Sequence, residues 1–400
     1  MHRRQFPLRR FGTHLSHSPD TKKSIATALI SAQDNGDKSN FVGATLDEIR
    51  ERISVVVPGI KSFVGLQIYQ FIYRKGVQSF YEMTNLSQSL REKLDEHFSV
   101  DYGVRKQDRF SKDGARKMLI GFREPNAVFE TVLIPMGDNR HTLCVSSQIG
   151  CSLNCRFCRT GTQKLTRHLL AEEIVGQYMI NAAAVDEFPI ENLKTRGVSN
   201  IVFMGQGEPL YNYKNVSKAV KILTDPQGIG MPKHKITIST AGVVPLIKRA
   251  GEELGVSLAI SLHAVNDDVR DVIVPLNKTY PIGMLLDTCR KYSRSMNNRT
   301  RRITFEYCLL KGVNDSLADA QELARLLKDI SAHVNVIPFN KWPGSEYETP
   351  DKETIEQFTN TIIENGTHAT LRTPRGLDIL AACGQLKSTH MNKASAPPNS

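Results

Sequence analysis

Short β-rich runs alternate with helical runs from Thr142 onward, and no other feature of the sequence limits the possible folds as strongly. Such alternation is typical of parallel strands that are joined by crossover helices. We expect strands at residues 142–147, 200–204, 235–240, 256–262, 302–309 and 334–338, with a further one at 369–373. We expect helices at residues 171–185, 213–223, 244–254, 282–297, 316–330 and 352–364. The fold class is therefore α/β, and an open, six-stranded β/α barrel is the most economical architecture.

The part of the chain before this alternation predicts a smaller domain and a connector. Leu86, Leu90 and Leu94 lie at helical spacing, and a helix is expected to begin near Thr84 and Asn85. Two β-rich runs, at 117–122 and 128–135, predict a pair of strands. In order along the chain we expect a basic disordered tail (1–40), a helical accessory domain (41–103), a β connector (104–136), the barrel core (137–386) and a second disordered tail (387–400).

Charge and cysteine content indicate the surroundings of the chain. A formal net charge of +11 and a pI near 9.3 favour RNA or DNA as a partner, although a basic surface without such a partner fits equally well. The cysteines, together with the lack of a secretory signal, favour a reducing cytosolic compartment, with organelle targeting by the Arg-rich start as the minor alternative. No apolar run approaches the about eighteen residues that a membrane-spanning helix needs.

Three cysteines, Cys151, Cys155 and Cys158, share one loop directly after the first barrel strand. An iron–sulfur cluster is normally held by four cysteine thiolates, so three ligands leave one iron open to a substrate or cofactor. The alternative is a structural zinc site in which Cys144 supplies a fourth thiolate. Zinc sites usually pair their cysteines in two separate halves of the chain, which favours the cluster.

Unusual residues also end the next three expected strands. The run 205–209 follows the second strand, Ser239 ends the third, and Ser261, Leu262 and His263 end the fourth. In barrels of parallel strands the chemistry lies at this carboxyl-terminal edge. Each residue alone is more often a strand-end cap or a satisfied polar group, so their common position is what indicates a site.

The cysteine loop and the run 205–209 resemble the radical S-adenosylmethionine superfamily. A closer similarity covers nearly all of residues 41–387 and is to the RlmN type of RNA methylase, which methylates C2 of adenosine in 23S rRNA and tRNA. It is carried, in the family's order, by residues 143–151, 207–212, 239–245, 261–264 and 375–386. One departure is Gln206, which stands where Met is frequent in the family.

This resemblance implies a partial (β/α)6 radical SAM barrel with its cofactors. One [4Fe-4S] cluster is expected on Cys151, Cys155 and Cys158. S-adenosylmethionine is expected to contact Gly207, Glu208, Ser239, Ser261, Leu262, His263 and Asn340.

The resemblance also assigns three catalytic residues. Cys383 accepts a methyl group from a first S-adenosylmethionine and becomes an S-methylcysteine, and a second molecule gives a 5′-deoxyadenosyl radical, so two are used per turnover. The methylene radical formed on Cys383 adds to adenine C2. Glu130 is then the proton acceptor, and Cys144 is the resolving thiol that forms a transient disulfide with Cys383. Without the resemblance, Glu130 is an exposed strand carboxylate and the two cysteines are inert buried thiols.

The implied function is dual-specificity adenine-C2 methylation of the peptidyl-transferase centre of 23S rRNA and of the adenosine 3′ of the tRNA anticodon. The implied partners are these RNAs and a flavodoxin- or ferredoxin-like electron donor, for a cytoplasmic monomer that does not bind membranes. Two alternatives stay open. One is a related adenine-C8 rRNA methylase that confers antibiotic resistance, and the other is a zinc-stabilised RNA-binding factor.

Overall fold

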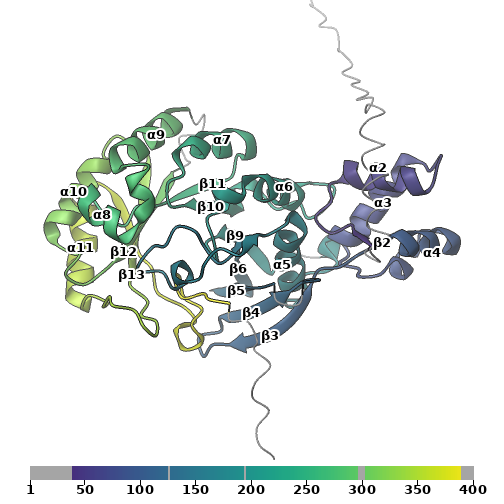
Figure 1. Ribbon diagram of the computed structural model, residues 1–400, viewed down its shortest axis with the longest axis horizontal. Helices are drawn as coiled ribbons and strands as arrows, with labels where there is room; N and C mark the ends of the chain where they lie inside the picture. Colours follow the sequence, from purple (N-terminus) through teal and green to yellow (C-terminus); the bar gives the residue numbers. More distant parts are fainter. Residues whose placement is uncertain (1–37, 125–126, 193–194, 296–301, 389–400) are drawn as a thin grey trace, which may run out of the picture.

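The computed structural model describes residues 38–124, 127–192, 195–295 and 302–388. The two expected tails, apart from residues 38–40 and 387–388, lie outside the described residues. Within them, the chain forms an α/β body and a smaller group of helices to one side of it (Figure 1). No helix in this part of the chain is long and apolar enough to cross a membrane.

One ten-stranded sheet forms the centre of the described structure, in the order β14-β13-β12-β11-β10-β9-β6-β5-β4-β3. From β6 to β14 every pair of neighbours is parallel, as the alternation in the sequence predicts. The bounds of these strands are β6 (Arg140–Cys144), β9 (Val198–Phe203), β10 (Ile236–Thr240), β11 (Ser257–Ser261), β12 (Ile303–Leu309), β13 (Ala332–Pro338) and β14 (His368–Leu371). The predicted partial barrel is thereby confirmed.

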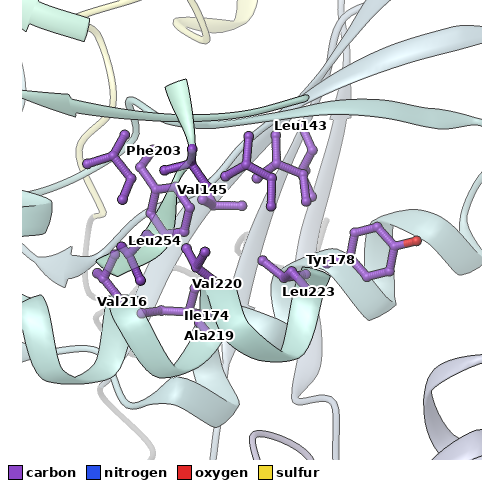
Figure 2. Close-up of a cluster of buried hydrophobic side chains, with 14 of the residues drawn as sticks. Leu143, Val145, Ile174, Tyr178, Phe203, Val216, Ala219, Val220, Leu223 and Leu254 are labelled. Carbon is purple, nitrogen blue, oxygen red and sulfur yellow. The ribbon is translucent and has the colours of Figure 1, made fainter. Parts of the chain in front are cut away.

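Crossover helices pack on this sheet. They are α5 (Ala171–Ala183), α6 (Tyr213–Thr224), α7 (Val244–Leu254), α9 (Ile282–Ser295), α10 (Leu317–Leu327) and α11 (Lys352–Glu364), and a short α8 (Asp267–Ile273) that was not predicted follows β11. Figure 2 shows how Ile174 and Tyr178 of α5 and Val220 of α6 meet Leu143 and Phe203 beneath the sheet. Full burial of each such side chain contributes about 1.5–3 kcal/mol, so this layer fixes β6 and β9 in place.

Three antiparallel strands extend the barrel sheet rather than forming a separate connector. They are β3 (Val104–Phe110), β4 (Arg116–Gly121) and β5 (Val128–Gly137). The predicted pair at 117–122 and 128–135 is confirmed as β4 and β5, while β3 was missed. β5 pairs with β6 in a tight hairpin, so the expected boundary between residues 136 and 137 falls inside β5. The sheet is therefore continuous from β3 to β14.

The accessory helices are α2 (Leu46–Val56), α3 (Ser62–Tyr73) and α4 (Gln88–His97), next to the short parallel pair β1 (Ser39–Asn40) and β2 (Phe98–Ser99). α2 begins with a capping box in which Thr45 and Glu48 satisfy each other's backbone N–H groups. α4 begins after Ser87, whose hydroxyl accepts from the Leu90 N–H, and not near Thr84 and Asn85 as predicted. Lys218 of α6 joins this group to the body through an ion pair with Glu48 at 2.7 Å.

Candidate functional site

The cysteine loop lies between β7 (Gln148–Ile149) and the short helix η2 (Arg159–Thr162). It folds back on itself, with the Cys158 N–H donating to the Cys155 carbonyl at 3.1 Å. Burial raises the pKa of all three thiols, to about 12 for Cys151, and negative charge on neighbouring thiols raises the pKa of Cys151 and Cys155 further. A metal cation stabilises the deprotonated form of such thiols. Binding of iron would therefore displace their protons.

A zinc ion and an iron–sulfur cluster require different arrangements of three thiols. In a cluster each thiolate binds a different iron, whereas zinc needs its ligands gathered around one point at about 2.3 Å. Among the described residues, no group of three His, Cys, Asp or Glu side chains is gathered closely enough to hold a single metal ion. The cluster on Cys151, Cys155 and Cys158 stays a prediction from the cysteine spacing.

His263 supports the cysteine loop from the end of β11. Its ring packs edge-on against Phe157, with ring centroids 4.7 Å apart. The Cys308 N–H donates to Nδ1 at 3.0 Å, so the neutral ring carries its proton on Nε2. Burial lowers the pKa of His263 to about 3, and the positive charge of Arg270 acts in the same direction. The imidazole is therefore an uncharged hydrogen-bond donor at neutral pH.

This burial predicts a pH-dependent stability. The pKa of His263 is about 6.5 in the unfolded chain and about 3 in the folded chain. Between these two pH values the unfolded chain binds a proton at His263 and the folded chain does not. From His263 alone, we expect the free energy of unfolding to fall by about 1.4 kcal/mol for each unit by which the pH is lowered within this window. Urea unfolding at several pH values checks this, with His263→Asn as the variant that should have a shallower slope. Equal slopes for both proteins would contradict the assignment.

Arg270 of α8 was not predicted as a site residue, yet it holds the strand ends together. It is fully buried and donates to the carbonyls of Ala241, Ser261 and Leu262 at 2.7, 3.0 and 2.9 Å. Its fourth partner is the side-chain oxygen of Asn277. Burial lowers the pKa of Arg270 only to about 10, so it stays charged at neutral pH. No local pattern singles out Arg270, because α8 has only seven residues.

Gly207 and Glu208 lie where the chain leaves β9. Gly207 has φ 97°, and a Cβ at this position would stand 2.4 Å from Cβ of Gln148, so only glycine fits. The Glu208 carboxylate is buried and accepts from the N–H groups of Leu210 and Ala241, at 3.0 and 2.8 Å. Burial raises the pKa of Glu208 to about 7. A cationic ligand group nearby would favour its ionised form.

The predicted S-adenosylmethionine contacts share one edge of the sheet. Ser239 lies near the end of β10, Ser261 ends β11 and Leu262 and His263 follow it directly. Asn340 follows β13, and its amide donates to the Cys383 carbonyl at 3.1 Å. One of the predicted cofactor contacts, Asn340, is therefore hydrogen-bonded directly to the predicted methyl carrier.

Glu130 is buried in β5, at 7% exposure, and is not the exposed strand carboxylate of the simpler interpretation. One carboxylate oxygen lies 3.0 Å from Nζ of Lys117 on β4. The other accepts from the Lys387 N–H at 2.8 Å. The side-chain oxygen of Gln206 accepts from the Glu130 N–H and from the Ser388 hydroxyl. Lys117 and Gln206 are parts of this arrangement that sequence reasoning missed.

Cys383 lies in a segment, residues 376–388, that crosses the edge of the sheet. The Arg159 N–H beside the cysteine loop donates to the Gly384 carbonyl at 2.7 Å. Cys383 as a residue is exposed, yet enough protein surrounds its thiol that burial raises the pKa of Cys383 to about 12. Negative charge on Glu306 and Cys144 adds to this effect.

Cys144 is buried at the end of β6, opposite Val132 of β5. It packs against Ala381 and Leu386, which flank Cys383 in the crossing segment. Burial raises the pKa of Cys144 to about 12. All seven cysteines of the chain lie in described residues and are free thiols, so the disulfide implied by the resemblance is not present in this structure.

The parallel sheet and its three-cysteine loop define a radical SAM enzyme. Residues 145–327 match the family model of the radical SAM superfamily, and residues 39–100 match that of the ribosomal RNA large subunit methyltransferase N-terminal domain. The chain is 52% identical over 353 residues to the dual-specificity RNA methyltransferase RlmN of Acidiphilium cryptum, which covers 88% of this chain and 89% of the relative. It therefore belongs to the RlmN family of RNA methyltransferases.

Further comparisons agree with this assignment. The RlmN protein of a Chelativorans species is 47% identical over 383 residues, covering 92% of this chain and 93% of that protein. A crystal structure of a radical SAM methyltransferase from Sphaerobacter thermophilus is 40% identical, with a TM-score of 0.80. The match covers 87% of this chain and 99% of that one, so both the accessory helices and the barrel are shared.

Proposed function

We propose that this enzyme methylates C2 of adenosine in both 23S rRNA, at the peptidyl-transferase centre, and tRNA, at the adenosine 3′ of the anticodon. The observation that carries the proposal is the convergence of Cys383, Cys144 and Glu130 beside the cysteine loop, which binding of the cofactors alone does not require. The enzyme would act as a cytoplasmic monomer with a flavodoxin- or ferredoxin-like electron donor.

The cofactors would occupy the edge of the sheet described above. Cys151, Cys155 and Cys158 would hold one [4Fe-4S] cluster, and Gly207 and Glu208 would lie at the amino group of S-adenosylmethionine. Once both are bound, they supply the radical that takes a hydrogen atom from a methyl group carried on Cys383. Two S-adenosylmethionine molecules are used per turnover, because the first supplies that methyl group.

Cys383 is suited to carry the methyl group. Adenine C2 is electron-poor and has no nucleophilic lone pair, so it cannot accept a methyl group directly from a sulfonium. A methylene radical on the Cys383 sulfur can instead add to C2, which links the RNA covalently to the protein. The exposure of Cys383 gives the base access, while contacts with Asn340 and Arg159 hold the segment near the cysteine loop.

Glu130 and Cys144 would release the product. The adduct formed by radical addition carries one unpaired electron, which would return to the cluster that supplied it, and the Glu130 carboxylate takes the proton from C2. Cys144, after losing its own proton, attacks the Cys383 sulfur, the bond from that sulfur to the methylene carbon breaks, and this carbon takes up a proton to become the methyl group. A Cys144–Cys383 disulfide remains and must be reduced by an external thiol before the next cycle. Burial raises the pKa of Cys144 to about 12, so its thiol is protonated at neutral pH.

The metal content tests the first part of the proposal. Protein purified without oxygen should be brown and contain about four irons per chain, because a [4Fe-4S] cluster gives this stoichiometry. Iron analysis and visible absorption measure it, and Cys155→Ala should lose most of the iron while Cys289→Ala keeps it. A colourless protein with one zinc per chain would favour the zinc-stabilised RNA-binding factor instead.

The product tests the second part. Nucleosides from 23S rRNA and tRNA of cells with and without the gene should differ in 2-methyladenosine, which mass spectrometry with standards separates from 8-methyladenosine. Methylation at C8 would replace the proposal with the resistance-type methylase. Methylation of one RNA alone would contradict dual specificity.

A further inference from the structure

A buried ion pair lies beneath the Cys383 segment. Nζ of Lys117 is 3.0 Å from Oε1 of Glu130, and the two side chains are only 7% and 9% exposed. The same Nζ donates to the Leu380 carbonyl at 3.0 Å, and Oε2 of Glu130 accepts from the Lys387 N–H at 2.8 Å. One ion pair thus binds the backbone on both sides of Cys383.

The register of the sheet produces this arrangement. Lys117 lies opposite Val132, and Glu130 lies opposite Leu119, so both charged side chains point to the same face from adjacent strands. Burial lowers the pKa of Lys117, and the charge of Glu130 opposes this change. A buried ammonium group costs several kcal/mol unless it is paired, so the ion pair with Glu130 offsets a cost that packing around Lys117 does not.

We propose that Lys117 is a positioning residue, which holds the Glu130 carboxylate in place and ties the Cys383 segment to the same pair of strands. This inference rests on the proposed roles of Glu130 and Cys383. The proton acceptor Glu130 and the segment that carries Cys383 are then both held by the β4–β5 strand pair. Lys117 itself touches neither substrate nor cofactor in this account.

The hydrogen bond from the Lys387 N–H to Glu130 also links proton transfer at Glu130 to the position of the Cys383 segment. When Glu130 takes the C2 proton, its carboxylate loses its charge, and the hydrogen bond from Lys387 loses its charge assistance. The remaining charges that act on Lys117 are the guanidinium groups of Arg109 on β3 and Arg159 in η2.

Variants of Lys117 test the proposal in the full-length, cluster-loaded enzyme. Methyl-labelled S-adenosylmethionine allows three quantities to be followed, namely methyl-Cys383, the covalent RNA adduct and released methylated RNA. Lys117→Met should still form methyl-Cys383 but release product at least tenfold more slowly, with the adduct accumulating. Lys117→Arg should behave as the wild type.

Controls separate this role from a purely structural one. Lys248→Met, which removes an exposed charge on α7, should leave all three quantities unchanged. If Lys117→Met does not fold or bind iron, Lys117→Gln replaces it with the same expected results. Unchanged product release would overturn the role of Lys117. So would an equal loss of methyl-Cys383, covalent adduct and released RNA. A wild-type enzyme that forms no methyl-Cys383 would instead contradict the proposed function itself.

Discussion

Cys383→Ala should abolish RNA methylation, with no 2-methyladenosine detectable after many nominal turnovers. The carrier sulfur is absent in this variant, and adenine C2 cannot take a methyl group directly from a sulfonium. Incubation with methyl-labelled S-adenosylmethionine should leave both the protein and the RNA without label. Mass spectrometry of the protein and of digested RNA measures the two products separately.

Cys289→Ala is the matched control for this substitution. Cys289 is fully buried in α9, in the layer of crossover helices, and none of the proposed steps uses it. This variant should methylate RNA as the wild type does, while a full iron content shows that both proteins are folded. Residual methylation by Cys383→Ala would refute the carrier role and would point to direct transfer.

Cys144→Ala should stop the reaction one stage later and leave RNA bound covalently to Cys383. Without this thiol nothing attacks the Cys383 sulfur, so the bond to the methylene carbon persists. We expect a shifted protein band on a denaturing gel, sensitive to ribonuclease, in stoichiometric yield. Released methylated RNA should fall by at least about a hundredfold, the scale of effect seen when a group acting only in a chemical step is removed.

The double variant Cys144→Ala, Cys383→Ala distinguishes this trap from nonspecific crosslinking. It should give no shifted band, because the carrier sulfur that forms the adduct is also missing. A band that persists in the double variant, or one absent from Cys144→Ala, would remove Cys144 from the proposed mechanism.

The sequence predicted most of the barrel because its elements carry strong local patterns. α7 and α11 begin and end at the predicted residues, since an apolar face and clear end signals define both. β3 was missed because it is an edge strand whose side chains are largely exposed, so it has no apolar alternation. α8 has only seven residues, and α2 buries only Ile49 and Ile53, so neither gives a clear period.

The candidate site shows a similar division. Spacing within one loop was enough to single out Cys151, Cys155 and Cys158, and a resemblance of whole segments indicated Cys383 and Glu130. Lys117 gave no local signal, because its partner carbonyl at Leu380 lies 263 residues further along the chain. The burial of Glu130 likewise depends on a segment that pairs with it only in the folded protein.

The β5–β6 hairpin limits where residues can be inserted into or deleted from this sequence without disturbing the site. Glu130 and Cys144 lie on paired strands of fixed register, whereas Cys383 lies in a segment outside the sheet, anchored at Leu380 and Lys387. An inserted residue lengthens an extended chain by about 3.5 Å, which is more than the length of a hydrogen bond. The loops around the site can therefore vary to accommodate other RNAs, while the number of residues between Cys383 and its anchors cannot.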